Sequence, residues 1–131
     1  ANNVASKVGA IANAGVNWEA IVANMGTAVD FSTDKTIKIK VWSTSSLPIL
    51  LKFEGGVNGE RQNEVSVTHG GTGWEELTFD FATSATKSYI DGNQGVGEAF
   101  VPTGQYKTMV IFVDGPGTAA GTFYIDDIIQ E

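Results

Sequence analysis

Short runs in which apolar and polar residues alternate make up most of this sequence, and each run ends in a cluster of small or turn-forming residues. In "TIKIKVWS", Ile37, Ile39 and Val41 share one face of an extended chain, while Trp42 shares the other face with two lysines. Side chains alternate in this way along a β-strand. A helical period of three to four residues is hard to find in any window of twelve, so the chain is predicted to be all-β.

Eight such runs are predicted strands, with no helix between them. They cover Val4–Ile11, Trp18–Met25 and the segments "TIKIKVWS", "PILLKFE", "RQNEVSVT", "WEELTFDF", "YKTMVIFVD" and "TFYIDDII". Many short strands separated by turns such as "EGGVNGE" predict an antiparallel β-sandwich of about eight strands. A chain of 131 residues is long enough for one core, so residues 1–131 are predicted to form a single domain. The long connection over residues 82–103 is of a length that is often functional.

Charge and composition narrow the classes of partner. The net charge is −7, which argues against nucleic acid and against an anionic membrane, because both would need a basic face. There is no cysteine, so disulfides, thiolate chemistry and Cys-based zinc sites are excluded, and no stretch approaches the length of a membrane span. Few charges and many glycines are typical of a secreted or cell-surface domain, and we expect a monomer.

Four stretches, taken in order, resemble one family. "VDFSTDKTIKIKVWS", "LLKFE", "GWEELTFDF" and "MVIFVDG" with "GTFYIDDI" resemble the carbohydrate-binding modules of the family 4/9/16/22 type, over about Val4 to Ile129. The resemblance implies a jelly-roll, galactose-binding-like sandwich appended to a secreted bacterial polysaccharide hydrolase. It also implies non-catalytic binding of a β-glucan such as laminarin, or of xylan. Such modules open with an extra N-terminal strand that carries an acidic residue. We expect this sandwich to lack that edge strand, or to fill its place with another part of the chain.

Two adjacent aspartates interrupt the last predicted strand. Alternation puts Asp126 and Asp127 on opposite faces, and because both faces are otherwise apolar, the strand is predicted to be covered on both sides. A buried carboxylate needs a partner. The resemblance implies that Asp126, with Asp127 as the second choice, ligates a structural Ca²⁺. The alternative is that one aspartate faces solvent and the other accepts hydrogen bonds from loop amides.

Aromatic side chains on polar faces and in loops are the predicted sugar-binding groups, because a flat ring packs against the CH-rich face of a pyranose. Trp42 lies on the polar face of its strand, Trp18 at the start of a strand, and Tyr89 in the long connection. The polar candidates for sugar hydroxyls are Glu54, Arg61 and Asn63, around "FEGGVNGERQNE". Each has a structural alternative: Trp42 covering lysine stems, Trp18 capping the core, and Glu54 forming a surface salt bridge with Arg61.

Catalysis is not expected. His69 is the only histidine and lies in the turn "THGGTG", and no Gly-x-Ser-x-Gly motif is present. Two other hypotheses remain beside glycan binding. One is a structural or adhesive spacer; the other is a small glycan lyase or hydrolase that uses a pair of its glutamates. Solvent-facing aromatics would favour binding over the spacer.

Overall fold

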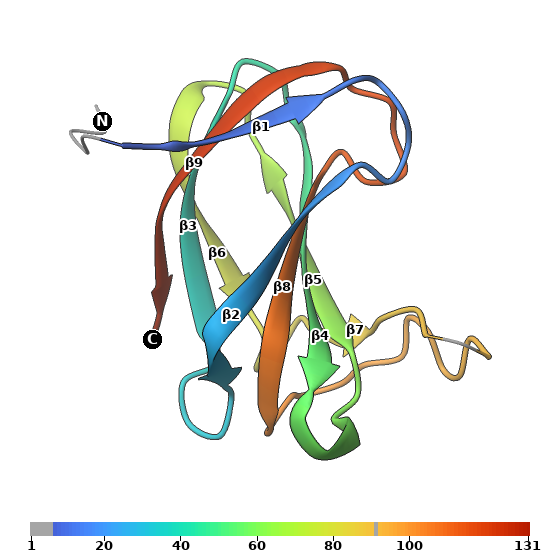
Figure 1. The fold of residues 1–131 in the computed structure, drawn as a ribbon. Coiled ribbons are helices and arrows are strands. Elements are labelled where there is room, and N and C mark those ends of the chain that lie inside the picture. The colour runs from blue at the N-terminus through green and yellow to red at the C-terminus, as the bar shows by residue number, and fades with distance from the viewer. Residues whose placement is uncertain (1–6, 91) are drawn as a thin grey trace.

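Two antiparallel sheets packed face to face form the fold in the computed structural model, which describes residues 7–90 and 92–131 (Figure 1). One sheet has the order β1 (Gly9–Asn13), β9 (Gly121–Gln130), β3 (Thr36–Ser43) and β6 (Gly73–Asp80). The other has the order β2 (Ala20–Asp30), β8 (Gln105–Val113), β4 (Leu47–Gly56), β5 (Asn63–His69) and β7 (Thr86–Lys87). A single 3₁₀ turn, Val57–Gly59, joins β4 to β5. The predicted all-β sandwich is confirmed.

Most strands lie close to where the alternation predicts them, although β2 continues to Asp30, past the predicted end at Met25, and two short elements also differ. The first strand, β1, begins at Gly9 and ends at Asn13, past the predicted end at Ile11; the predicted start at Val4 lies outside the described residues. β1 forms an edge of the four-stranded sheet, where it pairs with β9. The strand that the sequence did not predict, β7, is two residues long and lies within the long connection. Two residues are too few to show alternation.

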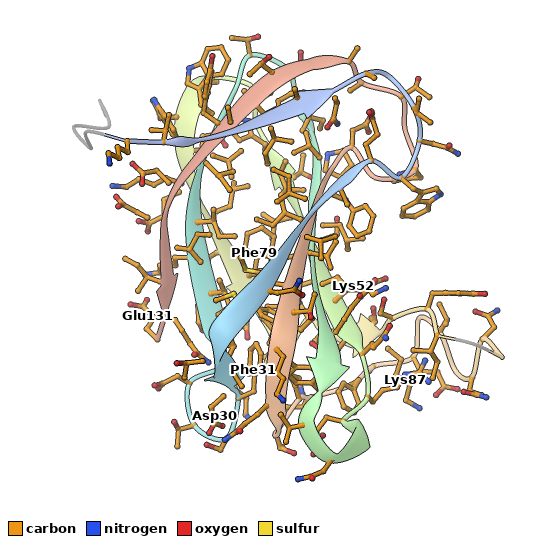
Figure 2. All side chains as sticks on the ribbon, viewed as in Figure 1. Asp30, Phe31, Lys52, Phe79, Lys87 and Glu131 are labelled. Atoms are coloured by element: carbon orange, nitrogen blue, oxygen red, sulfur yellow. The ribbon has the colours of Figure 1, made fainter. Side chains whose placement is uncertain are left out.

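The core lies between the sheets and is built from the alternating positions. Ile39 and Val41 of β3 and Ile49 and Leu51 of β4 all belong to this core, and all four side chains are fully buried. Burying each of them stabilises the fold by roughly 1.5–3 kcal/mol. One end of the core is aromatic, with ring centroids 4.9–6.1 Å apart among Phe31, Phe53, Phe81 and Tyr106. Figure 2 shows Phe31 and Phe79 in the space between the two sheets.

His69 is a buried polar side chain that links the two sheets. It ends β5, and its Nε2 lies 3.1 Å from the carbonyl oxygen of Val41, in β3 of the opposite sheet. Its Nδ1 accepts the Gly71 N–H at 2.9 Å, so the ring proton is on Nε2 and is donated to Val41. Both ring nitrogens are therefore satisfied by main chain.

Candidate functional site

A groove lies on the outer face of the five-stranded sheet. Its larger part has a volume of about 550 Å³ and is lined by Trp18, Leu50, Lys52, Glu64, Ser88, Tyr89, Val96 and Phe112. An adjoining hollow of about 400 Å³ is lined by Lys52, Glu54, Gln62, Tyr89 and Ile90. Because Lys52 and Tyr89 line both parts, they form one depression, called the groove below. Each part has a volume typical of small-molecule binding sites.

Trp18 forms one wall of the groove, from the loop between β1 and β2. Its side chain is 55% exposed, yet its position is fixed from below. The indole ring meets Phe112 of β8 edge to face, with ring centroids 5.8 Å apart. Its backbone N–H donates to the carbonyl oxygen of Gly115 at 2.5 Å. A Cβ on Gly115 would come within 3.2 Å of the indole ring, so the glycine leaves room for Trp18 to lie close to this loop.

Tyr89 forms another wall, from the loop that follows β7. It is 61% exposed, and the residue before it ties the loop to the sheet. Ser88 is buried, its hydroxyl donates to the Glu64 carboxylate at 2.6 Å, and its carbonyl oxygen accepts from the Arg61 guanidinium at 2.8 Å. The loop projects from the sandwich beside β7, on the side where Lys52 lies (Figure 2). Arg61 therefore supports the loop that carries Tyr89.

The floor of the groove combines charged and apolar groups. The Lys52 ammonium lies 2.6 Å from the Glu54 carboxylate, and Lys52 is in register with Glu64 on the neighbouring strand. The alternative role for Glu54, a surface salt bridge with Arg61, is therefore wrong: residues 52 and 54 lie on the same face of β4, so Glu54 pairs with Lys52, and the Arg61 guanidinium bonds to Ser88. Beside these charges lie Leu50 and Phe112. Such a floor suits a ligand with both apolar and hydroxyl-bearing surface.

Two of the predicted binding residues lie away from the groove. Asn63 is fully buried on the inner face of β5, where its side-chain amide donates to the Arg61 carbonyl oxygen. Trp42 lies on the outer face of the four-stranded sheet and packs edge to face with Tyr124, with ring centroids 5.5 Å apart. It is also in register with Trp74. The structure thus brings Trp18, Glu54 and Tyr89 together, separates Trp42 and Asn63 from them, and leaves Arg61 outside the lining of the groove.

The apolar part of the groove was missed from the sequence, although a signal for it exists. In "YKTMVIFVD", Met109, Ile111 and Val113 face the core, while Val110 and Phe112 face outward. A strand with apolar side chains on both faces needs other parts of the chain to shield both faces from water. Here the cover over Phe112 comes from Trp18, which belongs to a loop more than ninety positions away in the chain.

Asp126 and Asp127 lie at a β-bulge, which breaks the alternation on which their predicted placement depended. Lys38 pairs with Ile129 but Lys40 pairs with Asp126, so β9 carries one extra residue between these two pairs. Asp127 has a φ of 46°, and its carboxylate lies 2.5 Å from the Lys40 ammonium. This hydrogen bond raises the pKa of Lys40. Asp126 accepts the Asp127 N–H at 2.8 Å.

The prediction that the last strand is covered on both sides is therefore wrong. Past the bulge, Ile128 and Ile129 are 44% and 49% exposed. No three acidic or histidine side chains within residues 7–90 and 92–131 are grouped so that they could hold a metal ion. Calcium takes six to eight oxygen ligands, and the two aspartates alone do not fit that demand. Calcium binding here stays a prediction, which a comparison of Tm in calcium and in EDTA would check.

Chemically, the groove offers two exposed aromatic rings carried by loops, together with an ion pair, a second carboxylate and an apolar floor carried by the sheet. Across the described part of the chain, no helix is long and apolar enough to cross a membrane. No protein-family model matches the sequence, and no curated protein matches it.

Proposed function

We propose that this domain binds a polysaccharide chain in the groove without catalysing its cleavage. The observation that carries the proposal is the pairing of two exposed aromatic side chains, Trp18 and Tyr89, with a charged floor in one groove. A pyranose has CH-rich faces and a rim of hydroxyls. The aromatic rings would pack against the faces, and Lys52, Glu54 and Glu64 would bond to the hydroxyls.

The Trp18 side chain and the loop that carries Tyr89 are held in place before any ligand arrives. Trp18 rests on Phe112 and Gly115, and the loop that carries Tyr89 is tied to the sheet through Ser88. Groups that are already ordered lose less conformational entropy on binding than mobile ones. A prearranged groove therefore gives usable affinity from few contacts.

The proposed ligand is a neutral glycan, with a β-glucan such as laminarin first and xylan second. The overall charge of −7 would repel acidic polysaccharides. The preference for β-glucan is the one that the resemblance of the four sequence stretches implies. In a secreted hydrolase, the module would raise the local concentration of substrate around the attached catalytic domain.

Isothermal titration calorimetry with laminarin tests the proposal, with xylan, mannan and a cellulose oligosaccharide as comparators. We expect laminarin to bind, and Trp18→Ala and Tyr89→Ala each to weaken binding about tenfold or more. Trp42→Ala is the matched control, because it removes an indole from the opposite sheet.

The alternative results are distinct. Loss of binding in Trp42→Ala alone would move the site to the four-stranded sheet. Binding of a different glycan, with the same dependence on Trp18, would keep the groove and change the ligand. A folded protein that binds none of the four glycans would contradict the proposal and favour a structural spacer.

A further inference from the structure

One carboxylate closes the turn that precedes Trp18. Glu19 Oε1 accepts the Ala14 N–H at 2.7 Å, and Oε2 accepts the N–H groups of Gly15 and Val16, each at 3.1 Å. These three amides lie in the loop between β1 and β2, beyond the paired part of either strand. Bonds from N–H groups to an ionised carboxylate are about twice as strong as bonds between neutral groups. Glu19 thus holds the turn as one unit.

Trp18 leaves this turn with an unfavourable backbone conformation. Its φ of 62° lies in the left-handed region, which a bulky residue adopts only when its surroundings impose it. Two features impose this conformation. The turn closed by Glu19 precedes Trp18, and the Trp18 N–H donates a hydrogen bond to the carbonyl oxygen of Gly115. Figure 1 shows the two loops concerned side by side at one end of the sandwich, β1–β2 in blue and β8–β9 in orange-red.

We propose that Glu19 is the positioning residue for Trp18, so that glycan affinity depends on a side chain outside the lining of the groove; this inference rests on the proposed function. Without the Glu19 carboxylate, three adjacent amides lose their acceptor and the turn opens. Trp18 then relaxes from its left-handed backbone and its indole leaves the wall of the groove. A ligand would have to reorder the indole, and the apparent affinity is multiplied by the fraction of molecules that are still competent to bind.

Fluorine NMR of protein labelled with fluorinated tryptophan tests the placement of Trp18 without any ligand. The chain has three tryptophans, and loss of one resonance in Trp18→Phe assigns the signal of Trp18. In Glu19→Ala we expect this resonance to move toward the shift of free tryptophan, with the resonances of Trp42 and Trp74 showing that the fold is intact. Glu19→Gln keeps one carbonyl acceptor, and we expect an intermediate shift.

Glu75→Ala is the matched control. Glu75 accepts main-chain N–H groups from Gly70 and Thr72 in the turn between β5 and β6, so it has the same chemistry but lies outside the groove. We expect Glu19→Ala to weaken laminarin binding about tenfold, and Glu75→Ala to leave both the Trp18 resonance and the affinity unchanged.

The two proposals fail in different ways. An unmoved Trp18 resonance in Glu19→Ala would overturn the positioning role, whatever the glycan result. Wild-type affinity in Glu19→Ala would overturn it too, while the proposed function would stand. If the wild type binds no glycan, the proposed function fails, and the resonance alone decides whether Glu19 holds Trp18.

Discussion

His69 and Tyr106 are polar side chains with no exposed surface, and each is satisfied by a main-chain carbonyl of another segment. The His69 ring donates across the sandwich to the carbonyl oxygen of Val41, and the Tyr106 hydroxyl donates to the carbonyl oxygen of Arg61 at 2.7 Å. A buried polar group without a partner costs about 1–3 kcal/mol, so both positions tolerate few substitutions. The two bonds also restrict how the segments that they join can move.

We expect His69→Ala to lower the free energy of unfolding by about 3 kcal/mol, because it removes a packed ring and leaves two main-chain groups without a partner. Urea unfolding measures this. Thr68→Ala, at the exposed neighbouring position, is the control and should change the free energy by less than about 0.5 kcal/mol. Equal urea midpoints for the two variants would show that the hydrogen bond from His69 to Val41 contributes nothing to the free energy of unfolding.

Burial, followed by the negative charge of Glu60, raises the pKa of Tyr106 from 10.0 to about 12. The unfolded chain releases this proton first, so the free energy of unfolding should fall as pH rises from about 10 to about 12. The difference in tyrosinate absorbance between wild type and Tyr106→Phe should show one step near 12. A step at the ordinary pKa of tyrosine would contradict the buried placement.

At the scale of elements, alternation predicts the fold well where a strand is regular and has one polar face. β3 is such a strand, and its inner and outer residues were assigned correctly. The sequence was less informative for β9, because the bulge changes the alternation at Asp127 and exposes the two isoleucines beyond it. The sequence also could not show that Trp18 and Tyr89 line the same groove, because that depends on which sheet each of their loops borders. Asn63 was placed in a predicted strand but assigned to sugar binding because it lies beside the "FEGGVNGERQNE" hairpin, whereas it begins β5 with its side chain buried toward the core.

The bulge in β9 should depend on the backbone of Asp127 more than on its charge. Asparagine tolerates a left-handed φ, so Asp127→Asn should change the free energy of unfolding by less than about 1 kcal/mol, the usual contribution of an exposed ion pair. Asp127→Val should cost about 1–2 kcal/mol, because a β-branched side chain is strained there. Urea unfolding of both variants separates the two effects. Equal destabilisation would mean that the ion pair with Lys40 is what holds the bulge.

For the molecule as a whole, part of the acidity is structural. Within residues 7–90 and 92–131, the carboxyl groups with a pKa below the ordinary value include Glu19, Asp30, Glu75, Asp80 and Glu98. Main-chain amides are the first cause for Glu19, Asp30 and Glu75; the Thr83 hydroxyl is the first cause for Asp80, and the Lys87 ammonium for Glu98. The first four of these groups close turns within the loops, and Glu98 pairs with Lys87 across the loop that carries Tyr89. The net charge of −7 thus follows in part from the number of turns that are closed by a carboxylate.

This arrangement predicts how stability responds to acid. Each of these groups has a lower pKa in the folded chain than its ordinary values of 3.8 for aspartate and 4.5 for glutamate. Their contribution to stability is therefore present above those values and is lost as pH falls through the lowered folded pKa. We expect the urea midpoint to fall steadily below about pH 4.5.

Combining Glu19→Gln, Glu75→Gln and Glu98→Gln should flatten that fall, because three of the groups can then no longer take up a proton. The triple variant should also be less stable than the wild type at neutral pH, where its turns have lost an ionised acceptor, and the two proteins should converge in acid. A wild-type midpoint that stays constant with falling pH would mean that these carboxylates are as free in the fold as in the unfolded chain. Their place at the turns would then follow from solubility alone, and the closed turn before Trp18 would lose its electrostatic basis.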